Sequence, residues 1–373
     1  MKVTDQMTIF SVPTKIIIGK NCIQEQAALF SGLGTRALIV TGKRSAKTSG
    51  AEGDVRRALE ERSIPTAIYD RVESDPSTTV ARAAAEMARE HKADLVIGIG
   101  GGSPLDTAKV SAVLATNSID DETLFANVFP QKPLPIIAVP TTAGTGSEVT
   151  QYAMMTNDKV QSKSFVISDD IIPRVAFLDA TYTEHLPLTV TRNTALDALS
   201  HAMEGYLSKR ATEMSSFVAL ESMRVLGRCL PMLSRGVSLD LAVRERLLYA
   251  SLLAGIVISQ TGTTVLHAMG YSLTYFKKIE HGRANGLLMA DYLHYLLPDH
   301  QEKVMTVLRT LGLNGIADLK ALIGELVGSK ERLSEKEITA FSVIAMKARN
   351  MPFTLKAPSQ ADLEGMFRSS FLT

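Results

Sequence analysis

The chain has 373 residues, of which 45% are hydrophobic and 21% are charged, and its formal net charge is +1. This balance is typical of a globular protein with sizeable cores, and it gives no electrostatic case for nucleic acid or membrane partners. Two cysteines exclude a disulfide framework and favour a reducing compartment such as the cytoplasm. Residues 1–19 carry no signal-peptide core, and the longest apolar run, 247–258, is shorter than the roughly 20 residues that span a bilayer.

The first half of the chain alternates short apolar runs with helical patterns, which predicts a doubly wound parallel sheet. Strands are expected at 9–18 (an edge strand or hairpin), 36–41, 66–69, 94–99, 135–139 and 175–178, and helices at 21–31, 54–62 and 78–91.

Beyond about residue 184 the strand signals stop. Helical patterns cover 192–208, 213–229, 240–259, 262–273, 284–297 and most of the remainder. We therefore expect an α/β domain over residues 1–183 and an all-α domain over residues 184–373; the motifs described below suggest a dinucleotide for the first and a metal for the second.

Two glycine-rich turns each follow an expected strand. In Gly100-Gly-Gly-Ser-Pro104 the proline suits the first helical position and Ser103 suits the N-cap, so backbone N–H groups could hold a pyrophosphate there. The motif is not GxGxxG, and a tight turn without a ligand is an equally good reading. The second turn, Thr141-Thr-Ala-Gly-Thr-Gly-Ser-Glu148, would lie at the same edge of the sheet, and two such turns together favour a nucleotide.

One carboxylate and three imidazoles form a candidate metal site. Asp197 and His201 stand four apart in an apolar helical segment and so share one helix face. His267 and His281 follow, and this ligand set suits Fe²⁺ or Zn²⁺. The Asp197–His201 pair could instead be a surface hydrogen bond. The other four histidines are interpreted as ordinary core or surface residues: His91, His185, His294 and His300.

These motifs occur in an order that resembles the iron-containing (group III) alcohol dehydrogenase family over roughly residues 10–370. They are Gly100-Gly-Gly-Ser-Pro-Leu-Asp-Thr-Ala-Lys109, Pro140-Thr-Thr-Ala-Gly-Thr-Gly-Ser-Glu148, Leu196-Asp-Ala-Leu-Ser-His201, His267 and His281-Gly-Arg-Ala-Asn285. The resemblance implies the two-domain, dehydroquinate synthase-like plan, a metal held by Asp197, His201, His267 and His281, and usually a homodimer. It also implies coenzyme contacts from Gly101, Gly102, Ser103, Asp106, Thr141, Thr142, Thr145 and Lys163.

Three positions depart from the family pattern. Ala195 replaces a common glycine, Ala290 replaces a common proline, and Tyr271 stands where many members have a proton-relaying histidine. Tyr271 could pass a proton outward, or it could pack against the nicotinamide.

The expected activity is reversible hydride transfer between a small primary alcohol and a nicotinamide, with Fe²⁺, or Zn²⁺ as the alternative, acting on the substrate oxygen. The alternatives are a metal-dependent synthase or lyase of the dehydroquinate synthase type, a maleylacetate reductase or hydroxyacid–oxoacid transhydrogenase, and a non-enzymatic nucleotide-binding protein. The residues near the ligands in sequence are mostly Ala, Leu, Met, Thr and Ser, which favours a small, largely neutral substrate.

The choice of coenzyme depends on the segment Thr41-Gly-Lys-Arg-Ser45, after the first expected buried strand. NAD-specific folds place an acid at such a strand end to bind the ribose 2′-hydroxyl, and none is present. Gly42 leaves room and Lys43 adds positive charge, with Ser45 close by, so we predict a preference for NADP(H) over NAD(H).

Overall fold

Six strands from the first half of the chain form one parallel sheet in the order β1-β8-β5-β4-β2-β3. The computed structural model describes residues 7–236 and 239–372, so the outermost residues of the two expected domains, 1–6 and 373, lie outside it. The strands are β1 (Lys15–Ile18), β2 (Ala37–Thr41), β3 (Thr66–Tyr69), β4 (Leu95–Gly100), β5 (Ile136–Pro140) and β8 (Val175–Leu178). All six overlap the expected strands, and β1 is an edge strand, as the sequence indicated.

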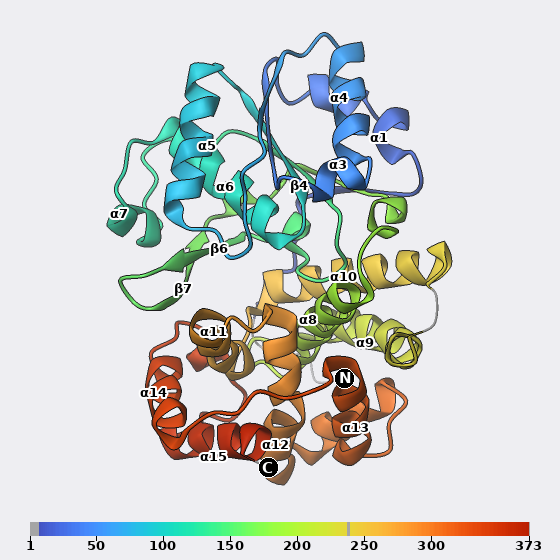
Figure 1. Cartoon of the computed structure of the whole chain (residues 1–373), viewed down its shortest axis with the longest axis vertical. Coiled ribbons are helices and arrows are strands. Elements are labelled where there is room, and N and C mark those ends of the chain that lie inside the picture. Colours follow the sequence, from blue (N-terminus) through green and yellow to red (C-terminus); the bar gives the residue numbers. More distant parts are fainter. Residues whose placement is uncertain (1–6, 237–238, 373) are drawn as a thin grey trace.

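Alternating side chains of each central strand enter two separate cores. Ala37 and Ile39 of β2 join a cluster with α1 (Cys22–Glu25) and α4 (Ala51–Glu61). Leu38 and Val40 join the opposite cluster, with α5 (Thr78–Glu90) and α6 (Gly102–Thr116). Because both faces of the sheet are covered, its central strands are continuously apolar, and the doubly wound sheet is confirmed (Figure 1).

Some local expectations were wrong. The helix expected at 21–31 is two short helices, α1 and α2 (Ala28–Ser31). The antiparallel hairpin of β6 (Tyr152–Asn157) and β7 (Ser162–Ile167) was not foreseen. Its strands mix polar and apolar residues and are mostly half-buried, so they lack the apolar run that marks a buried strand.

The second half is helical, and within its described residues no named strand occurs, so the expected all-α class is confirmed. Its helices are α8 (Leu188–Tyr206), α9 (Glu213–Ser234), α10 (Leu241–Thr261), α11 (Val265–Lys277), α12 (His281–Thr310), α13 (Ile316–Val327), α14 (Glu335–Met346) and α15 (Gln360–Phe371). They share one large core. No described helix combines the length and apolar character needed to cross a membrane.

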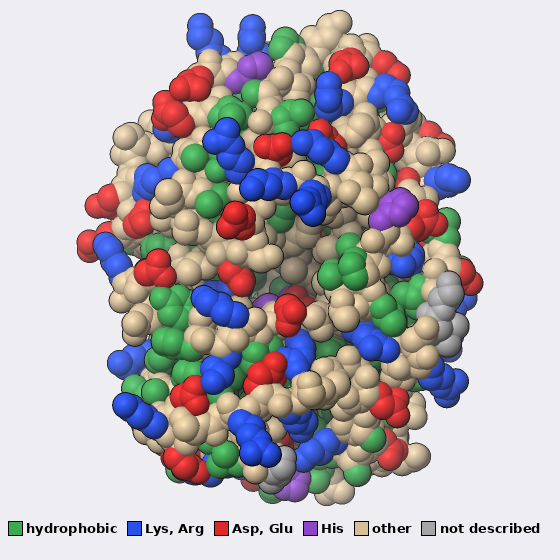
Figure 2. Space-filling model, in the orientation of Figure 1, with side chains coloured by type: hydrophobic (Ala, Val, Ile, Leu, Met, Phe, Trp, Pro, Cys, Tyr) green, Lys and Arg blue, Asp and Glu red, His purple; other side chains and the backbone are tan. Residues whose placement is uncertain are grey.

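The two halves stack one above the other, with the β6–β7 hairpin beside their boundary (Figure 1). On the face seen in Figure 2, a hollow lies at mid-height between them.

Candidate active site

The two glycine-rich turns lie side by side because β4 and β5 are neighbours in the sheet. A Cβ on Gly101 would lie 3.1 Å from the hydroxyl oxygen of Thr142, and a Cβ on Gly102 would lie 2.6 Å from Cγ2 of Thr145. A side chain at Gly102 would therefore have to displace Thr145 of the neighbouring turn. The hydroxyl of Thr141 is buried and has no hydrogen-bond partner among the described residues. The turns present backbone N–H groups and hydroxyls at the carboxyl ends of two strands, where α/β sheets bind ligands.

The helix after the first turn starts earlier than expected. The N-cap of α6 is Gly101, and Ser103 and Pro104 lie within its first turn. The prediction that Ser103 caps the helix was therefore wrong, because the extended backbone of Gly101 already ends the strand. The Ser103 hydroxyl instead accepts a hydrogen bond from the backbone N–H of Asp75, at 3.3 Å.

Asp106 is engaged within the protein. Its carboxylate accepts hydrogen bonds from the Ser147 hydroxyl (2.6 Å) and the Met154 backbone N–H (2.9 Å). Burial raises the pKa of this carboxyl group, although Lys109 opposes the shift. Asp106 therefore holds the second turn and β6 in place beside the first turn, whatever further contact it makes with a coenzyme.

The other expected coenzyme residues surround the same edge of the sheet. Gly42 follows β2, where a Cβ would lie 3.1 Å from the carbonyl oxygen of Val72. Lys43 and Ser45 are exposed, and Ser45 begins the short helix α3 (Ser45–Thr48). Lys163, on β7, forms an ion pair with Asp75, and its side chain is 11% exposed.

The four expected metal ligands converge from three helices. Asp197 and His201 lie on α8, His267 lies near the start of α11, and His281 is the first residue of α12. The Nε2 atoms of His201, His267 and His281 lie 3.8, 3.8 and 3.7 Å from Oδ1 of Asp197. Possible ligand atoms of Asp197, His267 and His281 all lie within 4.8 Å of one another. His201 lies outside that tighter group, with its ring stacked on His267 at a centroid distance of 4.8 Å.

This spacing fits a common cation. Ligand atoms about 2.0–2.2 Å from one ion in a tetrahedral arrangement lie about 3.3–3.6 Å from one another. The measured separations exceed hydrogen-bond length, so the imidazoles do not simply donate to the carboxylate. Three nitrogens and one oxygen, largely buried in a helical core, form the donor set that iron or zinc prefers.

The charge on Asp197 is stabilised by its neighbours. Burial alone would raise the pKa of Asp197, but the surrounding imidazoles, His201 first, hold it below its ordinary value. Burial lowers the pKa values of His201 and His281 although Asp197 opposes the shift, so their ring nitrogens give up a proton readily when a cation binds.

Glu204 is a site residue that the sequence argument missed. Its Oε2 atom contacts Nδ1 of His267, while Oε1 accepts hydrogen bonds from the Thr264 N–H (2.8 Å), the Thr264 hydroxyl (2.6 Å) and the His267 N–H (3.3 Å). Burial would lower the pKa of His267, but without a bound cation Glu204 and Asp197 together raise it to about 9; a cation at Nε2 displaces the proton there, while Nδ1 keeps its proton toward Glu204. An available signal was its position seven residues after Asp197, which puts an acid on the same face of an apolar helix.

Two further residues near the site were missed. The amide nitrogen of Asn285, one turn after His281, lies 3.1 Å from Nε2 of His267 and 3.4 Å from Oδ1 of Asp197. Lys109 is fully buried and donates to the Ser147 hydroxyl (2.8 Å) and to the carbonyl oxygen of Tyr152 (2.8 Å). Lys109 thus fixes the segment that leads from the second glycine-rich turn into β6.

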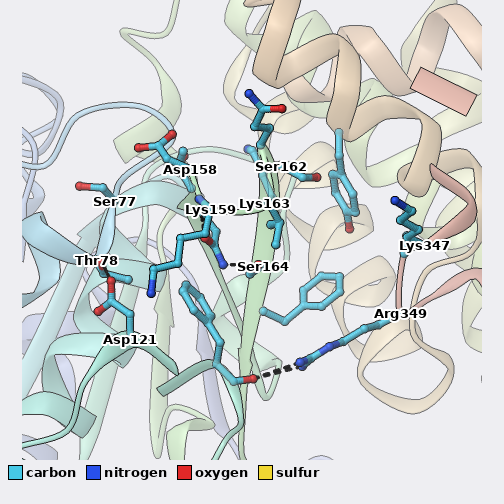
Figure 3. Close-up of a pocket in the computed structure, with 18 of the residues that line it drawn as sticks. Ser77, Thr78, Asp121, Asp158, Lys159, Ser162, Lys163, Ser164, Lys347 and Arg349 are labelled. Atoms are coloured by element: carbon cyan, nitrogen blue, oxygen red, sulfur yellow. Dashed lines mark hydrogen bonds between the residues drawn. The ribbon is translucent and has the colours of Figure 1, made fainter. Parts of the chain in front are cut away.

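Tyr271 separates the four ligands from a large cavity. Its ring stacks on His281 with centroids 5.8 Å apart, and it also lines a cavity of about 1050 Å³, to which Lys163 contributes as well (Figure 3). Burial raises the pKa of its hydroxyl well above the ordinary value, so the phenol stays protonated at neutral pH. Ala268 and Tyr271 thus connect the candidate metal centre to this cavity, whose lining residues include none of the four ligands and no residue of the two glycine-rich turns.

Comparisons with known proteins agree with this arrangement. The family model for "Iron-containing alcohol dehydrogenase" matches residues 13–180, and the C-terminal model of the same family matches residues 191–371. A 1,3-propanediol dehydrogenase of Klebsiella pneumoniae is 33% identical, over 91% of this chain and 86% of that enzyme.

Solved structures give the same result. An iron-containing alcohol dehydrogenase from Thermotoga maritima is 34% identical, with a TM-score of 0.91 and coverage of 98% of this chain and 100% of that one. A sulfoacetaldehyde reductase from Bifidobacterium kashiwanohense in complex with NAD⁺ is 26% identical, with a TM-score of 0.86 and coverage of 98% and 99%. These matches favour the dehydrogenase expectation over the synthase alternative. The chain therefore belongs to the iron-containing alcohol dehydrogenase family of oxidoreductases.

Proposed function

We propose that this chain catalyses reversible hydride transfer between a small primary alcohol, or its aldehyde, and a nicotinamide coenzyme, with Fe²⁺ bound by Asp197, His201, His267 and His281. The observation that carries the proposal is the approach of three Nε2 atoms to Oδ1 of Asp197, at 3.7–3.8 Å, beside a cavity that Ala268 and Tyr271 help to line.

The roles follow from these positions. A divalent ion in this site supplies Lewis-acid chemistry, lowering the pKa of the substrate hydroxyl and stabilising negative charge on its oxygen. Glu204 orients His267 so that Nε2 faces the site. Gly101, Gly102, Ser103 and Asp106 of the first turn, with Thr141, Thr142 and Thr145 of the second, hold the coenzyme at the end of the sheet. Lys163 approaches its ribose.

For Tyr271 we favour packing over proton relay. Its phenol is 4% exposed and its pKa is raised by burial, so it does not accept a proton near neutral pH. Its ring faces the cavity and stacks on His281, where it excludes water from the reacting atoms.

Metal analysis and turnover together test this proposal. Anaerobically purified protein is expected to contain about one iron per chain, with zinc as the competing outcome. It is expected to oxidise the reduced coenzyme in the presence of short aldehydes. His281→Ala should lose both metal and turnover, whereas His294→Ala, an exposed histidine on the same helix, should keep both. A His281→Ala protein with full metal content and turnover would refute the ligand assignment.

The coenzyme preference is a separate proposal. No acid follows β2, and the exposed Lys43 and Arg44 have no carboxylate partner among the described residues, which supports NADP(H) over NAD(H). One solved relative, the sulfoacetaldehyde reductase, is described in complex with NAD⁺. The ratio of kcat/KM for the two coenzymes decides the point, and a strong NAD(H) preference would refute the proposal.

We also propose a boundary between the two domains at residues 183/184, a homodimer and a cytoplasmic location. Both cysteines, Cys22 and Cys229, are free and buried, as is usual in a reducing compartment. Light scattering of the purified protein tests the dimer, and a monomer at micromolar concentration would exclude it.

The names of two relatives refer to a neutral diol and to an aldehyde that carries a sulfonate, so they differ in the charge of the substrate.

A further inference from the structure

The cavity beside the candidate metal centre has two chemically different sides. One side belongs to the α/β half and consists of α7 (Asp121–Phe125), Ser77–Thr79 and the β6–β7 hairpin. The other side belongs to the helical half and consists of residues from α11 and from the end of α14 onward. They are Ala268, Tyr271, Ile344, Lys347, Ala348 and Arg349. Because Ala268 directly follows His267 and Tyr271 stacks on His281, the helical side begins at the metal ligands.

The charges on the two sides are not distributed evenly. The α/β side carries acids as well as cations: Asp121, Glu122, Asp158, Lys159 and Lys163. The helical side carries two cations, Lys347 and Arg349, and no acid among its lining residues (Figure 3). A substrate that binds at the metal centre and extends past Tyr271 into this cavity would place its far end along this side.

The two cations have no carboxylate partner within ion-pair distance among the described residues. By contrast, Lys163 is paired with Asp75, and Asp121 is paired with Arg82 at 2.6 Å. Arg349 donates from both terminal nitrogens to the carbonyl oxygen of Phe125, at 3.2 Å each, across the cavity. A guanidinium has five N–H groups, so donors remain for a ligand.

A structural role explains only part of this arrangement. Lys347 is the C-cap residue of α14, where a cation interacts favourably with the helix dipole. Arg349 lies two residues beyond that position, so the dipole gives it no comparable reason to be basic. Both side chains are exposed, and neither is needed to fill a core.

We propose that the preferred substrate is a small alcohol or aldehyde whose far end carries an anionic group, a carboxylate, sulfonate or phosphonate, and that Lys347 and Arg349 bind this group. The proposal rests on the dehydrogenase function proposed above. It also limits the expectation of a neutral substrate, because that expectation used only residues near the ligands in sequence. Arginine and lysine together suit such oxyanions, since arginine can donate two parallel hydrogen bonds and lysine adds a compact charge.

Matched aldehyde pairs test the proposal. Succinic semialdehyde and butanal differ in a terminal carboxylate, and sulfoacetaldehyde and phosphonoacetaldehyde extend the series to other anions. For the iron-loaded enzyme, kcat/KM should be about 10- to 100-fold higher for the anionic member of the pair, as expected for one or two charge-assisted hydrogen bonds. The anion with the highest value identifies the substrate class.

Variants show whether the two cations cause the preference. A double variant, Lys347→Ala with Arg349→Ala, should lose the preference. The ratio of kcat/KM for succinic semialdehyde to that for butanal should fall toward one, mainly because the KM for succinic semialdehyde rises. The matched control is Lys336→Ala, which removes an exposed lysine at the other end of α14, outside the cavity, and should leave the ratio unchanged. Raising the salt concentration should also reduce the ratio for the wild type.

Three outcomes would overturn the inference. Equal kcat/KM values for the matched pair in the wild type would show that no anion site exists. An equal loss for both aldehydes in the double variant would show that the residues act on cleft geometry, through the contact between Arg349 and Phe125. An unchanged ratio in the double variant would place the preference elsewhere. If instead neither type of aldehyde is turned over and no metal is bound, the proposed function itself fails.

Discussion

Replacing Glu204 by glutamine should weaken metal binding without disrupting the surrounding helices. Three of the four contacts to this carboxylate are made by Oε1, which accepts from Thr264 twice and from the His267 backbone. A glutamine carbonyl oxygen can accept all three. Only the contact between Oε2 and Nδ1 of His267 changes, because an amide NH₂ replaces an acceptor with a donor.

That single change reverses the tautomer of the His267 imidazole. Beside an ionised Glu204, Nδ1 of His267 carries the proton, and Nε2 presents its lone pair toward Asp197, at 3.8 Å. Beside a glutamine NH₂, Nδ1 must accept, so the proton moves to Nε2 and blocks the metal-binding position. Losses of this kind are typically about 10- to 100-fold in metal affinity, or about 1.4–2.8 kcal/mol.

The assay is chelator competition with Co²⁺ or Zn²⁺, followed by elemental analysis of Glu204→Gln and wild-type protein at the same pH. The matched control is Glu221→Gln, which removes a half-buried carboxylate paired with Arg224 on α9, away from the metal ligands. Unfolding curves check that the Glu204→Gln protein remains folded. If a folded Glu204→Gln protein binds metal as tightly as the wild type, Glu204 does not set the tautomer of His267.

Three more changes test other parts of the site. Gly102→Ala should raise the coenzyme KM by about tenfold or more, because its Cβ would lie 2.6 Å from Cγ2 of Thr145; coenzyme titration with a Gly53→Ala control would show this. Tyr271→Phe should change kcat by less than about threefold at neutral pH, since the pKa of the buried phenol is raised. If the pH–rate profile instead shows kcat lowered by about 10²-fold or more, Tyr271 relays the proton after all. Burial raises the pKa of Glu148 from 4.5 to about 7, so its contribution to stability is complete below pH 4.5 and is lost as the pH rises through 7. In the Glu148→Gln protein the free energy of unfolding should not show that loss, which amounts to up to about 3 kcal/mol in the wild type. Urea unfolding of both proteins at pH 5 and pH 8 measures it, and the same pH dependence in both would contradict the prediction.

Periodicity in the sequence was enough to predict the two-part architecture. The apolar runs of β2, β4, β5 and β8 indicate buried parallel strands because both sheet faces are covered. The β6–β7 hairpin was not predicted because its strands are largely half-buried and carry no apolar run. How much of each strand is buried depends on the elements that pack beside the hairpin.

The parts of the site that lie within one short motif could be predicted from the sequence. Asp197 and His201 are neighbours on one helix face, so their proximity follows from spacing alone. The positions of His267, His281, Lys347 and Arg349 depend on how separate helices pack, which no local pattern specifies. Glu204 could have been predicted from spacing as well, since it shares a helix face with Asp197.

The glycines of the second turn show why the two halves cannot be understood separately. A Cβ on Gly144 would lie 2.7 Å from Cβ of Thr194, one turn before Asp197 on α8, and a Cβ on Gly255 of α10 would lie 2.6 Å from the carbonyl oxygen of Gly146. These residues therefore permit backbone contact between the dinucleotide-binding half and two helices of the metal-binding half. Thr142 and Thr145 of the same turn face the other side, against Gly101 and Gly102. One short turn thus contacts the first glycine-rich turn on one side and the helix that bears Asp197 on the other. In the reaction proposed above, such a turn would fix the distance between the coenzyme and the substrate oxygen, which hydride transfer requires to be short.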